Sequence, residues 1–204
     1  MIIMPEISYK KETQALNFFA HKKDGQINKM KAIKLVYLAD RFHLRKYGRP
    51  IVGDKYYAMK YGPVGSQTKN IAELSHASDD AISYAKKYIK PISVHKKNDS
   101  FVSIRKNDLS VFSKTDIECL ESIYKNFSDK DQFELAELTH KYPEWLKHEK
   151  DLKEGGRRRV EMDYNDFFGS GSKEEDLFKQ NKSELSLAKE SFKESQAISD
   201  FFSN

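Results

Sequence analysis

The sequence predicts a mainly helical α+β protein: a compact helical domain around a central buried helix, with one β-hairpin and a C-terminal helical extension. Three observations lead to this fold class. Apolar residues recur at helical spacing over residues 30–47, and a second helical stripe covers residues 117–127. Over residues 88–105, β-branched and aromatic residues alternate on either side of a polar turn, which is typical of a β-hairpin.

The composition indicates a single hydrophobic core within a strongly solvated surface. The chain has 204 residues, 13 Phe, 11 Tyr and 33% charged residues, with a mean hydropathy of -0.76. It contains no apolar run of membrane-spanning length and no secretory signal pattern, and the single Cys119 leaves no internal disulfide. We therefore expect a cytoplasmic protein without a membrane partner.

Two consecutive helices open the domain. The first is expected over residues 9–22, with Leu16 and Phe19 on its inner face, and the central helix follows over residues 30–47. Asn28 can cap the start of the central helix, and Gly48 can adopt the left-handed conformation that ends it.

The central helix carries an acid, Asp40, in the middle of its apolar stripe. A buried carboxylate without donors or a counter-charge would cost several kcal/mol, roughly, so the fold must supply partners. We expect Asp40 to accept hydrogen bonds from the loop at residues 47–57, or to pair with Arg41 or Arg49, and thereby to fix that loop.

Residues 49–64 are rich in turn residues and aromatics and predict an ordered loop with a short strand at residues 56–59. Alternation along this strand would turn Tyr57 and Met59 inward and leave Tyr56 and Tyr61 accessible. Ser66 is then expected to cap a short helix that runs to residue 75.

The predicted hairpin turns at residues 97–100, and two helices follow it. Ser113 and Asp116 form a capping-box pattern at the start of the helix that contains residues 117–127, and Asp131 begins another. The latter gives way near Pro143 to a piece that carries Trp145, and the domain is expected to close at residue 166.

Gly and Ser at positions 169–172 predict a flexible joint, which divides the chain into a domain of residues 1–166 and an arm of residues 167–204. In the arm, Phe178, Leu185 and Phe192 fall at helical spacing before an apolar tip. Two alternatives stay open: the arm folds back on its own domain, or it becomes ordered on a partner.

The net charge of +5 and the pI of 9.0 raise the possibility of nucleic-acid binding. Lysines are scattered among acids, however, and the one dense basic run, residues 157–159, is short and follows a Gly-Gly turn. No nucleic-acid-binding motif accompanies the charge, so we interpret it as solvated surface and do not expect direct nucleic-acid binding.

Polar residues near the central helix offer a catalytic interpretation, because an acid such as Asp40 can orient His43. No serine, cysteine or metal-ligand partner stands at a revealing spacing. We therefore predict no catalytic residue, metal or cofactor. The expected role of this set is a structural polar cluster, formed by Asp40, Arg41, His43, His140 and Trp145.

Two segments are candidates for a partner surface, because tyrosine, arginine and methionine are enriched at interface centres. The first candidate is the aromatic loop, with Arg49, Tyr56, Tyr57 and Tyr61. The second is the seam of the arm, with Phe178, Leu185 and Phe192.

Five blocks of the sequence carry a family resemblance: KLVYLADRFHL at 34–44, YGRPIVGDKYYA at 47–58, YGPV at 61–64, FSKTD at 112–116 and LTHKYPEW at 138–145. In this order and spacing they resemble the Panacea domain, over residues 10 to 166. The resemblance implies a mainly helical domain that acts as the antitoxin of a bacterial or phage toxin–antitoxin system and is not an enzyme.

The resemblance further implies that the domain neutralises a cognate protein toxin by direct binding, with action as a proteolytic adaptor and self-association into a homo-oligomer as further options. The alternatives are a nucleic-acid-binding transcriptional regulator, a regulator related to phage defence, or an enzyme that uses Asp40 and His43. No segment resembles the extra DNA-binding part of some relatives, which weighs against the regulator.

Overall fold

The computed structural model describes residues 5–93, 99–171 and 176–203 and has the predicted class, mainly helical with small antiparallel sheets. The long helices are α1 (Pro5–Lys22), α2 (Lys29–Tyr47), α5 (Lys114–Phe127) and α9 (Lys182–Ser203). The shorter helices are α3 (Ser66–Glu73), α4 (Asp79–Ala85), α6 (Gln132–Thr139), α7 (Pro143–Leu146) and α8 (Glu149–Lys153). Single 3-10 turns are η1 (Leu109–Val111), η2 (Tyr164–Phe168) and η3 (Asp176–Phe178).

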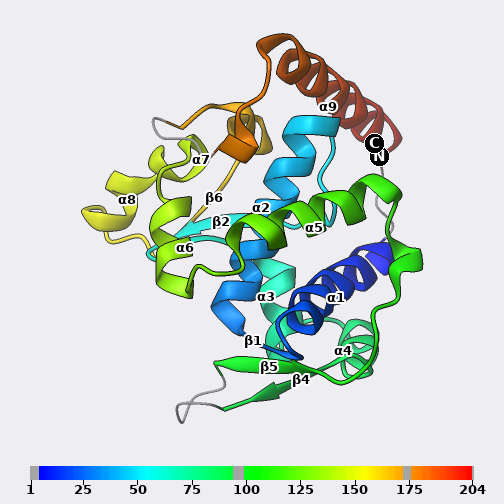
Figure 1. Ribbon diagram of the computed structural model, residues 1–204. Coiled ribbons are helices and arrows are strands. Elements are labelled where there is room, and N and C mark those ends of the chain that lie inside the picture. Colours follow the sequence, from blue (N-terminus) through cyan, green and yellow to red (C-terminus); the bar gives the residue numbers. More distant parts are fainter. Residues whose placement is uncertain (1–4, 94–98, 172–175, 204) are drawn as a thin grey trace.

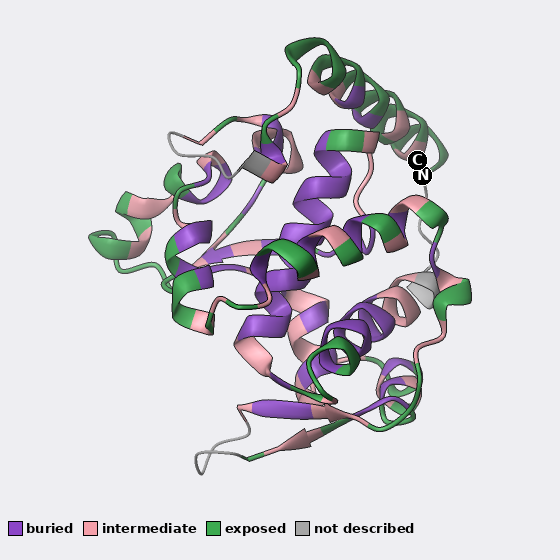
Figure 2. Ribbon diagram, in the orientation of Figure 1, coloured by how far each residue is buried: buried purple, intermediate pink, exposed green. Residues whose placement is uncertain are grey.

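Helix α2 is the central element, as predicted. It runs through the middle of the molecule and packs against α1, α5, α6 and α9 (Figure 1). Its residues from Lys31 to Arg45 are buried on every side, so the helix is coloured almost continuously as buried in Figure 2. The Asn28 side chain caps its first turn, and Gly48, at φ 69°, ends it in the left-handed conformation. The sequence prediction of this helix and of both its ends is confirmed.

The predicted hairpin forms one edge of a three-stranded antiparallel sheet. Strands β4 (Ile89–Ile92) and β5 (Ser100–Ser103) pair with each other, and β1 (Gln26–Asn28) adds to the other side of β5. The hairpin is confirmed, although positions 97 and 98 of its expected turn lie outside the described residues. Strand β1 was not predicted, because three residues between two helices are too short to show alternation.

A second sheet, in the order β3-β2-β6, was predicted only at its central strand. Strand β2 (Tyr56–Met59) pairs with β3 (Gly62–Gly65) in a tight hairpin and with β6 (Arg159–Glu161), about a hundred residues further along the chain. The predicted alternation of β2 is wrong. Tyr56 is only 2% exposed and lies in the core, whereas Tyr57 and Met59 are half-buried on the outer face. The reason is that the Tyr56 hydroxyl donates a hydrogen bond to Asp40 inside the protein.

The start of α3 also differs from the prediction. Gly65, not Ser66, occupies the N-cap position and offers no side chain. The Asp54 carboxylate takes over the capping function and accepts hydrogen bonds from the backbone N–H groups of Gln67 (3.0 Å) and Thr68 (2.7 Å). A cap supplied from a distant loop leaves no local pattern in the sequence. Helix α4 was not predicted.

Helices α5 and α6 begin as predicted, each at a capping box. Ser113 and Asp116 cap α5, and Asp131 and Glu134 cap α6. Helix α7 follows at Pro143 and buries Trp145 completely, at 1% exposure.

The C-terminal helix α9 folds back onto its own domain, where it packs on α2 and η2 (Figure 1). Phe178 is fully buried against the rings of Phe42 and Tyr142, and Phe192 is buried beside Phe168. The prediction that Phe178 and Phe192 form a surface for a partner is therefore wrong, because both side chains belong to the core. Among the helices of the described residues, none has the length and apolar character needed to cross a membrane.

Candidate partner-binding surface

Asp40 fixes the loop that follows α2. Its carboxylate accepts hydrogen bonds from the backbone N–H groups of Ile51, Val52 and Gly53 at 2.8 to 3.0 Å and from the Tyr56 hydroxyl at 3.0 Å. Burial raises the pKa of Asp40 to about 6, although these four donors favour the charged form. Of the two arrangements expected for Asp40, the structure contains the first: the loop supplies the donors, and Arg41 points elsewhere.

Two buried arginines of α2 attach it to the segments that follow α6. Arg41 pairs with Glu144 of α7, with Nε 2.7 Å from Oε1, and its guanidinium lies over the Tyr142 ring. Arg45 donates to the carbonyl oxygens of Gly169 (2.7 Å) and Phe178 (3.2 Å). Both side chains are at most 1% exposed, so their charged hydrogen bonds hold α7 and the residues around Gly169 and Phe178 against α2.

His43 belongs to a separate cluster at the start of α5. Its Nδ1 donates to the carbonyl oxygen of Arg49 (2.7 Å), and its Nε2 lies 3.0 Å from Thr115 Oγ1. Burial lowers the pKa of His43 to about 4, so the ring is neutral near pH 7. The Arg49 guanidinium pairs with the buried Asp116 at 2.8 Å, which makes Arg49 part of this cluster.

His140 and Trp145 form a third group, in which their rings stack at 3.8 Å and the indole N–H donates to the carbonyl oxygen of Met59. The five residues predicted as one polar cluster thus lie in distinct groups around α2, each joining it or β2 to a distant segment. Burial raises the pKa of Cys119 to about 12, which leaves it a poor nucleophile. Within the described ranges, no three His, Cys, Asp or Glu side chains converge to hold a metal ion.

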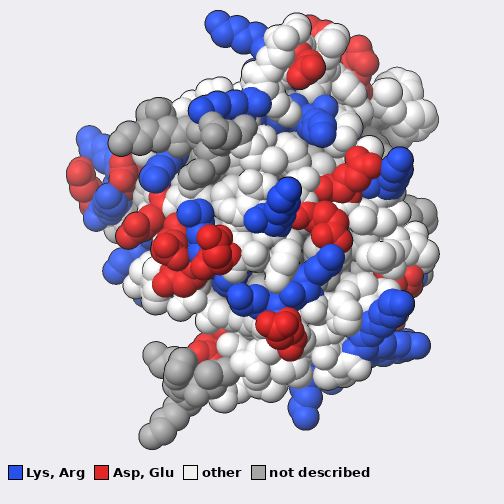
Figure 3. All heavy atoms as spheres, in the orientation of Figure 1, with Lys and Arg blue, Asp and Glu red and all other residues white. Residues whose placement is uncertain are grey.

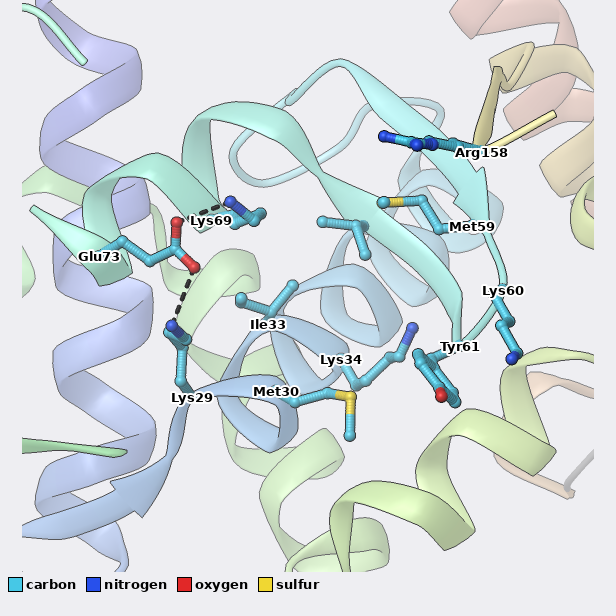
Figure 4. A pocket seen from close by; sticks show the side chains of 11 residues that line it. Lys29, Met30, Ile33, Lys34, Met59, Lys60, Tyr61, Lys69, Glu73 and Arg158 are labelled. Carbon is cyan, nitrogen blue, oxygen red and sulfur yellow. Dashed lines mark hydrogen bonds and ion pairs between the residues drawn. The ribbon is translucent and has the colours of Figure 1, made fainter. Parts of the chain in front are cut away.

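The most distinctive surface feature is a pocket of about 330 Å³ between the start of α2, the β2–β3 hairpin and α3 (Figure 4). Its walls are apolar and consist of Met30, Ile33, Met59, Tyr61 and Val64. Five cationic side chains also line it, against one acid, Glu73; the cations are Lys29, Lys34, Lys60, Lys69 and Arg158. The pocket therefore combines an apolar interior with a cationic rim.

Lys34 is the unusual member of this set. Its side chain is fully buried beneath the hairpin, where Nζ donates to the carbonyl oxygen of Pro63 at 2.7 Å. Burial lowers the pKa of Lys34 to about 7, and in the described part of the chain no carboxylate pairs with it. Lys34 stands three residues before Tyr37 and seven before Arg41 on α2, so helical spacing could have placed it on the buried face.

The outer face of the second sheet continues the pocket. Tyr57 lies directly opposite Val64 on β3, and Met59 lies opposite Arg159 on β6, so these four side chains share one face. The Arg159 guanidinium covers the Tyr57 ring at 4.9 Å. We call the pocket and this sheet face together the hairpin surface.

The predicted partner residues are therefore divided by the structure. Tyr61, at 56% exposure, lines the pocket, and Tyr57 lies on the adjoining sheet face. Arg49 belongs to the cluster beside α5, and Tyr56 belongs to the core. Leu185 lines a separate hollow between α9 and η2. The pocket residues Lys34 and Arg158 were not singled out in the sequence, because they come from segments more than a hundred residues apart.

Comparison of the chain with curated proteins and with solved structures gave no match. A family model does match, over residues 33–146, and its description is "Antitoxin SocA-like, Panacea domain". The matched range begins in α2 and ends in α7, and thus covers the central helix, the hairpin β2–β3 and the capped helices α5 and α6. Because this range spans more than half of the chain, the protein belongs to the SocA-like antitoxin family with the Panacea domain.

Proposed function

We propose that the protein is an antitoxin that neutralises a cognate protein toxin by direct binding, and that the hairpin surface is where the toxin docks. The observation that carries the proposal is an apolar, partly aromatic pocket lined by more cations than acids in a member of an antitoxin family. Such a combination of exposed apolar anchors and charge is typical of a surface that binds another protein.

The remainder of the molecule suits a binding scaffold. The polar groups of α2 are engaged in holding α7, η2 and η3, and those beside α5 hold the loop after α2. A rigid support keeps the ordering cost low when the hairpin surface binds a partner.

A nucleic-acid interface finds less support. Arg157 pairs with Asp151, and Arg159 stacks on Tyr57, so the basic run at residues 157–159 does not form a free phosphate-binding stripe. On the face shown in Figure 3, positive and negative side chains are interspersed.

The test is co-expression of the chain with the product of each neighbouring open reading frame, with host growth and co-purification as readouts. The protein should rescue growth from one otherwise toxic neighbour and form a stable complex with it. Replacing Tyr57 and Tyr61 by Ala should weaken both rescue and complex formation. Ile104→Ala is the matched control, since Ile104 is 51% exposed beside β5 and lies outside the hairpin surface.

Two modes of neutralisation are separated by the lifetime of the toxin. An antitoxin that occludes its toxin leaves the toxin level constant after protein synthesis is stopped, whereas a proteolytic adaptor shortens that lifetime. We propose occlusion, because it requires only that the toxin docks on the hairpin surface, whereas an adaptor must also bind a protease. Rapid loss of the toxin only when the antitoxin is present would contradict this mode. Failure of every neighbour to bind or to be rescued would contradict the antitoxin function itself.

A further inference from the structure

The positive charges of the pocket are partly compensated on one side only. The Glu73 carboxylate forms ion pairs with the amines of Lys29 (2.8 Å) and Lys69 (2.6 Å). These three side chains lie together on one side of the pocket (Figure 4). Lys60 and Arg158 lie on the opposite side, near Met59 and Tyr61, and neither forms an ion pair with any described residue. One side of the pocket is therefore partly compensated by Glu73, whereas the other, the cationic side, has no acid among the lining residues.

The buried Lys34 increases the positive potential on the cationic side. In Figure 4 its amine lies close to Tyr61, beneath the β2–β3 hairpin. The side chain is fully buried, so its charge is screened less than that of an exposed lysine. A buried ammonium without a counter-charge is costly in the free protein, and a nearby anion would lower this cost.

The walls indicate what kind of anion fits. The pocket is lined by two methionines, Ile33, Val64 and Tyr61, and methionine adapts its shape to different apolar side chains. A bare phosphate or a nucleic-acid backbone would leave these walls unfilled. An acidic polypeptide that carries an apolar side chain would fill the walls and meet the cations at the same time.

We propose that the pocket recognises an acidic segment of the partner protein, with one apolar side chain inserted against Met30, Ile33 and Met59 and flanking carboxylates paired with Lys60 and Arg158. This inference rests on the proposed function, since it names the part of the toxin that the antitoxin contacts. A carboxylate near Lys34 would favour the protonated amine, and the resulting buried charge would favour a carboxylate over a neutral group.

The direct test measures fluorescence anisotropy of labelled hexapeptides with the full chain. The probe peptide has a central Leu-Phe pair flanked on both sides by Asp and Glu. The first comparison peptide replaces the acids by Asn and Gln, and the second replaces Leu-Phe by Ser-Ser. The acidic Leu-Phe peptide should bind at least about tenfold more tightly than either comparison peptide. Equal binding of the amide peptide would overturn the inference.

Variants of the protein locate the binding site. Reversal of charge in a Lys60→Glu, Arg158→Glu double variant should weaken binding of the acidic peptide by about tenfold or more. Arg157→Glu is the control, because Arg157 is also exposed, stands next to Arg158 in sequence and lies outside the pocket; since it removes the ion pair with Asp151, its melting temperature is measured as well. Lys34→Met should also weaken peptide binding, and because it removes an uncompensated buried charge it should not lower the melting temperature. Binding that is unchanged in the double variant would overturn the assignment to this pocket.

Three further outcomes separate this inference from the function on which it rests. If an oligothymidylate binds more tightly than the acidic peptide and competes with it, the pocket is a nucleic-acid site and the inference is wrong. If the Lys60→Glu, Arg158→Glu variant still neutralises the toxin as the native chain does, acidic recognition is wrong while the antitoxin function stands. If the peptide binds as described but no neighbouring gene product is neutralised, the pocket's preference stands and the proposed function falls.

Discussion

At the scale of single residues, Asp40 links the central helix to the loop that leads into the hairpin surface. Replacing it by Ala would leave two buried backbone N–H groups, the half-buried N–H of Gly53 and the Tyr56 hydroxyl without their acceptor. We expect Asp40→Ala to lower the free energy of unfolding by about 3 kcal/mol, measured by urea denaturation. The control Asp129→Ala, at an exposed turn, should change it by less than about 0.5 kcal/mol. An unchanged unfolding midpoint for Asp40→Ala would show that the loop is held by other contacts.

The buried Lys34 is expected to make the free energy of unfolding depend on pH. Burial lowers its pKa to about 7 in the folded state, from 10.5 in the unfolded chain. Between these two values the unfolded state binds more protons, so the free energy of unfolding should rise with pH, by up to about 1.4 kcal/mol per pH unit. Its neighbour His140 does not titrate in this window, because burial lowers the pKa of that imidazole to about 4.

The measurement is urea denaturation at several pH values between 7 and 10.5, with the native chain and Lys34→Met. The variant should show a smaller slope and should be the more stable protein at pH 7. The control Lys125→Met, on the exposed side of α5, should keep the native slope. Parallel curves for the native chain and Lys34→Met would mean that the amine keeps its proton after folding.

At the scale of elements, Gly48 sets how closely α9 approaches the end of α2. A Cβ atom there would lie 2.6 Å from the carbonyl oxygen of Ala188 and 2.9 Å from Ser191 Cβ, and Gly48 also has a φ of +69°. Gly156 has a similar φ, +68°, with nothing within 4 Å of the same position. The two glycines thus share the left-handed conformation and differ in the contact with α9.

We therefore expect Gly48→Ala to displace α9, whereas Gly156→Ala should cost only the backbone strain, about 1 kcal/mol. The measurement is limited proteolysis, in which cleavage within α9 should become faster for Gly48→Ala alone, together with a larger fall in melting temperature. Equal effects of both substitutions would indicate that α9 adjusts to the added methyl group without moving away.

The elements also show what could be predicted from the sequence and why the rest could not. Helix α2 was predicted with both ends and α5 with its start, because apolar period and caps such as Ser113 are local signals. Strand β6 and the cap of α3 by Asp54 were not, since both depend on partners far away in the chain. The wrong face for Tyr56 has the same origin: alternation gives the period of a strand, and only a contact such as that with Asp40 decides which side is buried.

The candidate site was predicted only in part for a related reason. Aromatic composition pointed to Tyr57 and Tyr61, which do lie on the hairpin surface. The charges of the pocket come from α2, α3, the hairpin and the segment before β6, and no spacing rule connects Lys29, Lys69 and Arg158. A surface assembled from such distant segments becomes visible only after the fold brings them together.

At the scale of the whole molecule, Phe178, which follows the predicted joint, is part of the core. Arg45 donates to the carbonyl oxygens of both Gly169 and Phe178, and the Phe178 ring packs on Phe42, Phe127 and Tyr142. Phe178 thus fills a space between α2 and α5 that no earlier residue occupies. This makes a specific prediction about shortened chains.

A chain that ends at residue 181 removes α9 and keeps Phe178, whereas a chain that ends at residue 171 removes both. Loss of α9 removes Phe192 and exposes Phe168 on η2, against which Phe192 packs. Because α9 covers the outside of the domain, its loss should lower the melting temperature moderately. Loss of Phe178 as well removes the carbonyl oxygen to which Arg45 Nη2 donates and opens a large cavity, which together should cost about 3 to 5 kcal/mol more. Thermal and urea unfolding of the two chains measures the difference, with Phe178→Ala in the full chain as the control that keeps α9. Equal stability of the two shortened chains would show that the core closes without Phe178 and that the arm begins, as the sequence alone indicated, at the Gly-Ser segment.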